Sequence, residues 1–239
     1  MTLLNETELS RYQRQLIVPE IGEAGQGKLQ KAHVLVVGAG GLGSPVLMYL
    51  AAAGVGSLGI VDADMIEVSN LQRQVLYTTE DVGLYKAEQA ALRLKMLNPH
   101  VSVRAYPVRY TQANASEILR DYDIAADCSD NYATRYLLSD TTRNSGIPMI
   151  YGAVNNFMGQ ASVFNYMGGP SYRDLYPEEM DIPPDTRRTE QGVIGALPGI
   201  IGSVQACEII KIITGAGDTL TGKLLQVDAL NLRAEIISI

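Results

Sequence analysis

Short apolar runs alternate with amphipathic stretches along the first 151 residues of the chain. Residues 86–97 are typical of the amphipathic stretches, because alanine and leucine recur there every three or four positions and Pro99 then stops the helix. The pattern predicts strands at 33–37, 57–62, 101–106, 123–127 and 148–151, and helices at 6–18, 25–31, 44–53, 86–97 and 131–145. Strands that alternate with helices pair in parallel, so we expect a Rossmann-like, doubly wound α/β sheet.

The pattern changes after Tyr151. A predicted strand at 160–166 has no helix after it, and residues 168–192 are rich in glycine, proline and charge, which predicts a long loop of the kind that often faces a ligand. A helix at 198–214 and an antiparallel hairpin at 223–228 and 232–237 follow. We therefore expect a single domain over 1–239. It comprises N-terminal helices in 1–31, a nucleotide-binding core in 32–151, and an antiparallel extension in 152–239 with a crossover loop at about 168–192.

A glycine-rich turn follows the first predicted strand. Gly38, Gly40 and Gly43 match the dinucleotide fingerprint in its strand–turn–helix context, where glycines allow the backbone to turn tightly and approach a phosphate or ribose. Asp62 and Asp64 end the next strand, and Asp62 lies at the distance where an acid binds ribose hydroxyls. The alternative is a glycine-rich turn without a ligand. The fingerprint alone does not distinguish NAD from ATP.

Charged residues further along the chain favour ATP. Arg73, flanked by Asn70 and Gln72, and Lys86, at a helix start, have no role in a minimal NAD site. A lone cation in the first turn opposes the helix dipole, and a bound phosphate would reverse that cost. Asp130 ends a strand where open sheets bind ligands, and its carboxylate suits Mg²⁺. The alternatives are solvated surface charges for the two cations and a helix N-cap for Asp130.

Composition excludes several classes of function. The formal net charge is −7 over 239 residues, whereas nonspecific nucleic-acid binding needs a basic surface. No run approaches the roughly 18 to 20 apolar residues of a membrane helix, and the N-terminus is too polar for a signal peptide. Cys128 and Cys207 form no CxxC pair, and we expect both to be buried. We expect a cytoplasmic protein that binds neither membrane nor nucleic acid.

Several motifs taken together resemble the ThiF/MoeB/HesA family of bacterial relatives of ubiquitin-activating enzymes, and its ThiF members above all. The resemblance covers nearly the whole chain. Its motifs are Arg11-Tyr12-Gln13-Arg14-Gln15, the 38–43 loop, Ser69-Asn70-Leu71-Gln72-Arg73-Gln74, Lys86, Asp127-Cys128-Ser129-Asp130-Asn131, and the 195–211 segment.

The resemblance implies a reaction on ATP. Such enzymes adenylate the C-terminal glycine carboxylate of a small ubiquitin-like sulfur carrier protein that ends in Gly-Gly. The carboxylate attacks the α-phosphorus of Mg-ATP and pyrophosphate leaves. Because a carboxylate is a poor nucleophile toward an anionic phosphate, catalysis must come from positioning and charge neutralisation.

The resemblance also implies roles for individual residues. The Gly41 backbone and Asp62 hold the nucleoside, Asp130 holds Mg²⁺, and Arg14 reaches the phosphates in the partner subunit's site, which implies a homodimer. The phosphates are held by Asn70, Arg73 and Lys86. The expected catalytic residues are Arg14, Arg73, Lys86 and Asp130, and the expected nucleotide-binding residues are Gly38, Gly40, Gly41, Gly43, Asp62, Asp64, Asn70, Gln72, Arg73, Lys86 and Asn131.

The chain departs from the family pattern in two places. Many relatives carry two CxxC pairs that bind Zn²⁺, but here Ser171 and Asp174 replace the first pair and no second pair follows, so we expect no zinc. Residues 185–192 contain no cysteine, so we expect adenylation without a covalent enzyme–carrier intermediate. Arg187 and Arg188 either meet an acidic partner surface or are solvated.

Other functions remain open at this stage. We expect the carrier to serve thiamine synthesis, with molybdopterin synthesis as the second choice. On the same fold the carboxylate could belong to a small molecule, a peptide or a tRNA-borne group, although the acidic charge disfavours the last. An NAD(P)-dependent oxidoreductase would leave Arg73, Lys86 and Asp130 unexplained. The intact Arg73 and Asp130 also disfavour a non-catalytic relative that only binds a partner.

Overall fold

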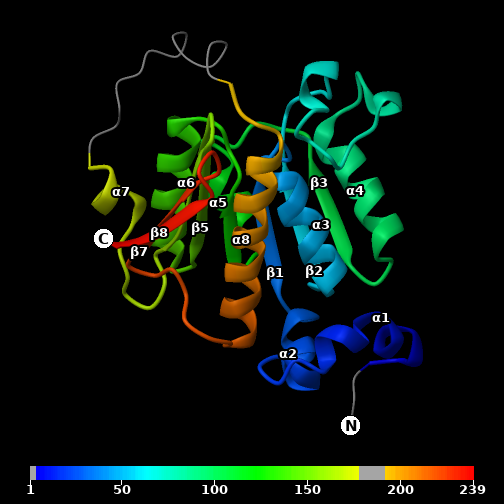
Figure 1. Cartoon of the computed structure of the whole chain (residues 1–239). Coiled ribbons are helices and arrows are strands. Elements are labelled where there is room, and N and C mark those ends of the chain that lie inside the picture. Colours follow the sequence, from blue (N-terminus) through cyan, green and yellow to red (C-terminus); the bar gives the residue numbers. More distant parts are fainter. Residues whose placement is uncertain (1–3, 178–191) are drawn as a thin grey trace.

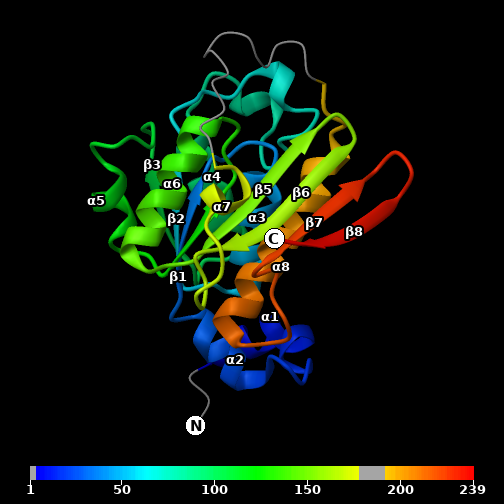
Figure 2. The ribbon, with the colours of Figure 1, turned by 90° about the vertical axis from the view of Figure 1, so that its left-hand side faces the viewer.

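The structure, a computed structural model, describes residues 4–177 and 192–239. Within these ranges eight strands form one sheet in the order β3-β2-β1-β4-β5-β6-β7-β8 (Figures 1 and 2). The strands are β1 (His33–Val37), β2 (Ser57–Val61), β3 (Ser102–Tyr106), β4 (Ile124–Asp127), β5 (Met149–Asn155), β6 (Met158–Phe164), β7 (Lys223–Asp228) and β8 (Arg233–Ser238).

Helices precede, connect and cover these strands. The α-helices in the described part of the chain are α1 (Glu6–Leu16), α2 (Gly22–Leu29), α3 (Gly43–Ala53), α4 (Lys86–Leu97), α5 (Ala115–Leu119), α6 (Tyr132–Ser145), α7 (Tyr172–Leu175) and α8 (Ala196–Thr214). Two 3₁₀ turns, η1 (Val68–Asn70) and η2 (Thr79–Asp81), lie between β2 and α4. The expected mixed sheet, with a parallel core and antiparallel C-terminal strands, is confirmed.

The five strands of the parallel half place their carboxyl ends at one edge. Val37, the last residue of β1, pairs with Val61 of β2 on one side and with Asp127 of β4 on the other. The segments that follow these three residues therefore start side by side. The chain turns from β1 toward β2 and β3 on one side and toward β4 and β5 on the other, which makes this edge the topological switch point where such sheets bind ligands.

The antiparallel half begins earlier than the sequence pattern predicted. The strand expected at 148–151 extends to Asn155, where it turns back into β6 through Asn156 and Phe157. Asn156 has a positive φ of 52°, a conformation that asparagine tolerates better than most residues. The hairpin of β7 and β8 then continues the sheet antiparallel to β6, as expected.

Both faces of the sheet are covered by apolar clusters. Val34 and Val36 of β1 face a cluster built with α3, α4 and α8, whereas Leu35 and Val37 face one built with α5 and α6. This alternation follows from the period of two along a strand. Strands buried on both faces explain why the first half reads as continuous apolar runs rather than alternating ones. Each fully buried leucine stabilises the fold by about 1.5–3 kcal/mol.

Helix α8 differs from expectation in two ways. By length and composition alone its 19 residues could cross a membrane, with a mean hydropathy of 1.5, although no uninterrupted apolar run of that length exists. Its Leu197, Ile201 and Ile209 are buried in the core cluster, as expected of a helix that packs against a sheet. Cys207 was expected to be buried but is exposed, because it lies on the outward face of α8, whereas Cys128 is buried as expected.

Two short helices escaped the sequence analysis. Helix α5 has only five residues and α7 only four, which is too short to show a hydrophobic period. Helix α7 lies inside the segment 168–192 that was predicted to be a loop. The rest of that segment from residue 178 to 191, with Arg187 and Arg188, lies outside the described residues.

Candidate nucleotide site

The glycine loop between β1 and α3 is so closely packed that side chains would not fit at two of its positions. Gly38 has a φ of +99°, and a Cβ there would overlap the carbonyl group of Cys128. A Cβ at Gly43 would overlap the carbonyl oxygen of Gly38 itself. Gly38 is therefore glycine for its conformation and its contact with the β4 loop, and Gly43 allows the helix to start against the turn, as the fingerprint implies.

Asp62 is bonded directly to this loop. One carboxylate oxygen accepts the N–H of Ala39 at 2.8 Å, and the other accepts the N–H of Asp64 at 2.8 Å. Burial raises the pKa of Asp62, and the nearby charge of Lys86 opposes that rise. The carboxylate expected to bind ribose hydroxyls is thus held beside the glycine loop.

Lys86 begins α4 and points back to the same place. Its Nζ lies 3.0 Å from Oδ2 of Asp64, and its backbone N–H donates to the Asp64 carbonyl at 3.0 Å. The hydroxyl of Tyr77 is 2.7 Å from the carbonyl oxygen of Ala39 and 3.2 Å from that of Lys86. Tyr77 therefore joins the glycine loop to the first turn of α4, and nothing in its sequence context indicated this role.

Arg73 and Gln74 lie against the glycine loop from a second side. A Cβ at Gly41 would be 3.5 Å from Cγ of Arg73, whose Nη1 donates to the carbonyl of Ser69 at 3.0 Å. A Cβ at Gly40 would be 3.4 Å from Nε2 of Gln74. The Oε1 of the buried Gln74 has no hydrogen-bond partner among the described residues. An orphaned buried amide oxygen beside a glycine turn fits a ligand with hydrogen-bond donors, such as a base or ribose.

Asn70 and Gln72 serve the segment that carries Arg73. Asn70 is buried, and its Oδ1 accepts the N–H of Glu67 at 3.2 Å, which closes η1. Gln72 is exposed, and its backbone carbonyl lies so close to Gly195 that a Cβ there would overlap it. Asn70 was expected to bind phosphate, and in the structure its side chain also shapes the turn before Arg73.

Asp130 and Asn131 follow β4 at the same edge of the sheet, and both are exposed. The N-cap of α6 is Asn131, whose Oδ1 accepts the N–H of Thr134 at 2.8 Å. The alternative that Asp130 caps this helix is therefore wrong. Because the carbonyl of Cys128 touches Gly38, the segment that carries Asp130 is packed directly against the glycine loop.

The arrangement brings an acid that can bind ribose, two cations and an exposed carboxylate around one glycine turn. The model of the ThiF family matches residues 12–239, which is nearly the whole chain. The chain belongs to the ThiF family.

Curated relatives share much of the sequence. The chain is 52% identical over 228 residues to "Sulfur carrier protein adenylyltransferase" of Thermus thermophilus, a match that covers 93% of this chain and 84% of the relative. It is 47% identical to "SAMP-activating enzyme E1" of Haloferax volcanii, over 99% of this chain and 88% of the relative. It is 45% identical to "Probable adenylyltransferase/sulfurtransferase MoeZ" of Mycobacterium tuberculosis, where the match spans 99% of this chain and 61% of the relative.

Solved structures share the fold at lower sequence identity. PaaA superposes with a TM-score of 0.85 at 22% identity, over 100% of this chain and 76% of PaaA. MccB of E. coli in the structure with ATP has a TM-score of 0.82 at 21% identity, over 99% of this chain and 72% of MccB. These likenesses show a ThiF-like fold for the chain.

Arg14 is the expected ThiF-family site residue that the fold does not bring to the glycine loop. It is exposed on α1, which lies with α2 at the end of the molecule opposite the carboxyl ends of the parallel strands (Figure 1). Gln15, its neighbour, donates to Gln26 of α2 at 2.6 Å and to the carbonyl of Ala53 at 3.1 Å, so α1 is attached at that end.

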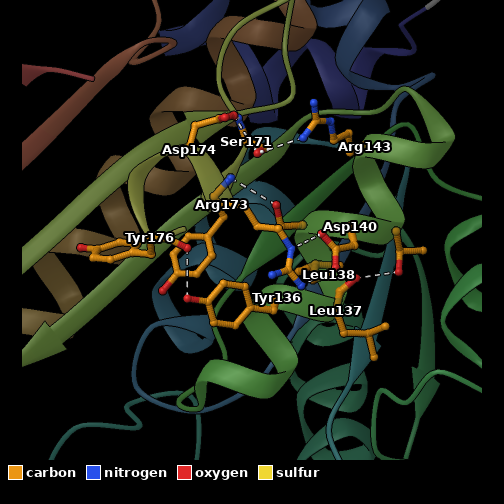
Figure 3. Close-up of polar contacts among 12 residues, drawn as sticks. Tyr136, Leu137, Leu138, Asp140, Arg143, Ser171, Arg173, Asp174 and Tyr176 are labelled. Carbon is orange, nitrogen blue, oxygen red and sulfur yellow. Dashed lines mark hydrogen bonds and ion pairs between the residues drawn. The ribbon is translucent and has the colours of Figure 1, made fainter. Parts of the chain in front are cut away.

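The residues at the position of the first zinc-binding pair do not fit zinc. The carboxylate of Asp174 accepts the N–H and the hydroxyl of Ser171 at 2.6 and 2.8 Å, and these bonds lower the pKa of Asp174 (Figure 3). The Nη1 of Arg143 lies 3.4 Å from the Ser171 hydroxyl. Zinc sites of this kind need thiolates, and here a serine and its partner close the first turn of α7 instead. Within residues 4–177 and 192–239 no group of three or more His, Cys, Asp or Glu side chains could hold a metal.

Contacts between α6 and α7 hold α7 against the sheet domain without any metal ligand among the residues involved. Arg173 makes two bonds of 2.9 Å to the carboxylate of Asp140, and its guanidinium lies 4.7 Å from the ring centre of Tyr136 (Figure 3). The Tyr136 hydroxyl donates to the carbonyl of Tyr176 at 3.1 Å. We call this set, with Ser171 and Asp174, the α6–α7 clasp.

Proposed function

We propose that this protein is an ATP-dependent adenylyltransferase that activates the C-terminal glycine carboxylate of a small ubiquitin-like sulfur carrier protein. Its membership in the nucleotidyltransferases follows from relatives at 45–52% identity that are named adenylyltransferases. The observation that carries the proposal for this chain is the convergence of Asp62, Arg73 and Lys86 on one glycine loop. Two cations near a closely packed glycine loop suit a triphosphate better than a dinucleotide.

The proposed reaction needs no proton transfer. A carboxylate oxygen of the carrier forms a bond to the α-phosphorus of ATP, the bond from that phosphorus to the bridging oxygen breaks, and pyrophosphate leaves with the electron pair. Arg73 and Lys86 neutralise the charge that builds on the phosphates, and Asp62 orients the ribose. Fixed charges that are already in place stabilise a transition state without reorganisation. Mg²⁺, held through Asp130, would supply further charge neutralisation.

We place Arg14 in the site of a second copy of the chain. Its position on α1, at the end opposite the strand carboxyl ends, supports a role in a neighbouring subunit rather than in its own, and we therefore propose a homodimer as the active form. Mixing inactive Arg14→Ala and Arg73→Ala dimers tests this directly. Half of the reassembled dimers would be mixed, each with one intact site, so about a quarter of the wild-type activity should return. A mixture that stays inactive after demonstrated subunit exchange would contradict the shared site.

Neither cysteine fits a role as nucleophile for the carrier. Burial raises the pKa of Cys128 well above its ordinary value, and the adjacent charge of Asp127 raises it further, so the thiolate is disfavoured. Cys207 lies in the middle of α8. We therefore propose that the acyl-adenylate is the product that leaves the site.

The proposal also extends to the biosynthetic pathway that the carrier protein serves. We place thiamine synthesis first and molybdopterin synthesis second, and the activity in the cytoplasm. Carriers of either pathway would present a C-terminal glycine carboxylate to the same catalytic site. Carriers of both kinds should therefore be tested.

ATP–pyrophosphate exchange with Mg²⁺ tests the function. We expect exchange that requires a carrier ending in Gly-Gly and that disappears when the last glycine is deleted or its carboxylate is amidated. Exchange with a small-molecule acid, a peptide or a tRNA that bears a carboxylate group in place of the carrier would reassign the substrate on the same fold. Binding of a nicotinamide cofactor without any exchange would favour an oxidoreductase.

A further inference from the structure

A buried charge pair lies beneath the segment that carries Asp130. Asp127, the last residue of β4, has no exposed side-chain surface, and Arg135, near the start of α6, exposes 11% of its side chain. The Nε of Arg135 is 3.4 Å from Oδ2 of Asp127. The guanidinium also lies 5.5 Å from the ring centre of Tyr151 and 5.7 Å from that of Tyr132.

Both partners of the pair hold the residue that precedes Asp130. The carboxylate of Asp127 accepts the N–H of Ser129 at 3.0 Å and its hydroxyl at 2.5 Å. The Nη2 of Arg135 donates to the carbonyl of Ser129 at 3.2 Å. The backbone N–H and the backbone carbonyl of Ser129 are therefore both hydrogen-bonded to the members of a single ion pair. From the other face of the sheet, Gln205 of α8 donates to the carbonyl of Asp127 at 2.8 Å.

Stability alone is a poor explanation for this pair. Replacing a buried ion pair by apolar residues of similar volume is often neutral or stabilising, because two charges must lose their hydration on burial. The pair is also not optimised as a salt bridge, since Oδ2 of Asp127 and Nε of Arg135 have no hydrogen-bond partner among the described residues. The guanidinium lies beside Tyr151, a member of the apolar cluster on this face of the sheet, so leucine or methionine is a chemically compatible replacement for Arg135.

We propose that Arg135 is a positioning residue for Asp130, and that with Asp127 it holds the Ser129 backbone so that the Asp130 carboxylate faces the metal-bound phosphates. This role rests on the proposed function, because the orientation of Asp130 matters to the reaction only if Asp130 holds Mg²⁺ on bound ATP. A carboxylate in an exposed segment gains metal affinity when the backbone behind it is fixed, as outer partners of metal ligands do elsewhere.

The test compares the Mg²⁺ dependence of ATP–pyrophosphate exchange in Arg135→Leu and Arg173→Leu. Arg173 is a matched control, because it also pairs with an aspartate and lies over a tyrosine of the same aromatic cluster, but it contacts α6 rather than the Ser129–Asp130 segment. We expect Arg135→Leu to raise the Mg²⁺ concentration for half-maximal exchange roughly 10- to 100-fold, and Arg173→Leu to leave it unchanged.

A second variant separates positioning from folding. Arg135→Leu leaves Asp127 buried without a counter-charge, which destabilises the fold. The double variant Asp127→Asn/Arg135→Leu removes both charges, while the amide oxygen introduced at position 127 still offers an acceptor to Ser129. We expect its Tm to recover toward the wild-type value while the Mg²⁺ requirement stays raised. A double variant with a wild-type Mg²⁺ requirement would overturn the positioning role and leave a purely structural one.

Calorimetric titration of Mg-ATP into the same variants, without carrier, distinguishes the two levels of the proposal. A wild-type protein that shows no exchange but binds ATP in a Mg²⁺-dependent way, weakened in Arg135→Leu, would reject the carrier substrate and keep the positioning role. Wild-type exchange with equal Mg²⁺ dependence of ATP binding in wild type and variant would reject the positioning role and keep the function.

Discussion

The Nζ of Lys86 lies 3.0 Å from the Oδ2 of Asp64, with the lysine buried and the aspartate 65% exposed. The lysine approaches the site along the first turn of α4, so its methylene stem is covered and its charge reaches the mouth of the glycine loop. Asp64 forms an ion pair with this charge, and Asp62 is close enough for the charge to affect its pKa. A phosphate oxygen can take the place of Asp64, and the positive end of the α4 dipole then favours the anion.

Lys86→Met should lower the exchange rate by about 10²–10³-fold, because it removes one charge that stabilises the transition state in a largely dry site. Asp64→Asn should have a much smaller effect, since it keeps the shape of the side chain and removes only the resting partner of Lys86. The measurement is kcat for ATP–pyrophosphate exchange in both variants. Equal losses in the two would mean that Asp64 is itself part of the catalytic machinery.

Arg73→Ala should abolish activation while the protein stays folded. The Arg73 side chain lies beside Gly41 and makes one hydrogen bond to a backbone carbonyl, so its loss removes catalytic charge rather than core packing. We expect a fall of at least about 10²-fold in exchange and an unchanged Tm. Arg104→Ala is the control, because the Arg104 side chain is 65% exposed on β3 and contacts the exposed Asp121 at 3.6 Å and the ring of Tyr106, both away from the glycine loop. Near-normal exchange in Arg73→Ala would show that the phosphate site is wrongly assigned.

Asp62 should make stability depend on pH in a defined direction. Burial raises its native pKa above the ordinary value of 3.8, so between these two values the native state binds more protons than the unfolded state. The contribution of Asp62 to stability is therefore present at low pH and is lost as the pH rises through the raised pKa.

Thermal unfolding of wild type and Asp62→Asn across pH ~4 to ~8 checks this sign. The Tm of the variant minus that of the wild type should increase with pH and level off once native Asp62 is ionised. A difference that decreases with pH would mean that hydrogen bonds from Ala39 and Asp64 outweigh burial and lower the pKa instead.

The α6–α7 clasp should work without metal. Treatment with a strong chelator, followed by removal of the chelator and addition of Mg²⁺, should leave the Tm and the exchange activity unchanged. Metal analysis of protein purified without chelators should find no stoichiometric zinc. Asp174→Ala should destabilise the protein by about 0.5–2 kcal/mol, the usual effect of losing a helix cap, because it frees the N–H and hydroxyl of the buried Ser171. One zinc per chain, or a Tm that falls on chelation, would overturn this reading of Ser171 and Asp174.

Local signals were sufficient for much of the fold. Helix α4 begins at Lys86 and ends at Leu97 as predicted. Both signals are local in the sequence: apolar residues recur every three or four positions, and Pro99 stops the helix. Gly54 ends α3 in a left-handed conformation, with a φ of 81°, as a glycine just past a helix was expected to do. Helix α7 and the extension of β5 to Asn155 were missed, because capping contacts and a hairpin turn override weak local patterns.

The sequence by itself determined the glycine loop, the order of the strands and the longer helices, and the family, since each depends on residue types at short spacing along the chain. It also predicted Asp62, Arg73 and Lys86 as site residues, but only through motifs. The tertiary structure decided that Val37 pairs with both Val61 and Asp127, which brings three loops to one edge. It decided that Lys86 meets Asp64 and that Arg135 holds the backbone beside Asp130. These contacts depend on how elements that are distant in the sequence pack together. The register of a sheet and the partner of a buried charge therefore cannot be predicted from a local sequence pattern.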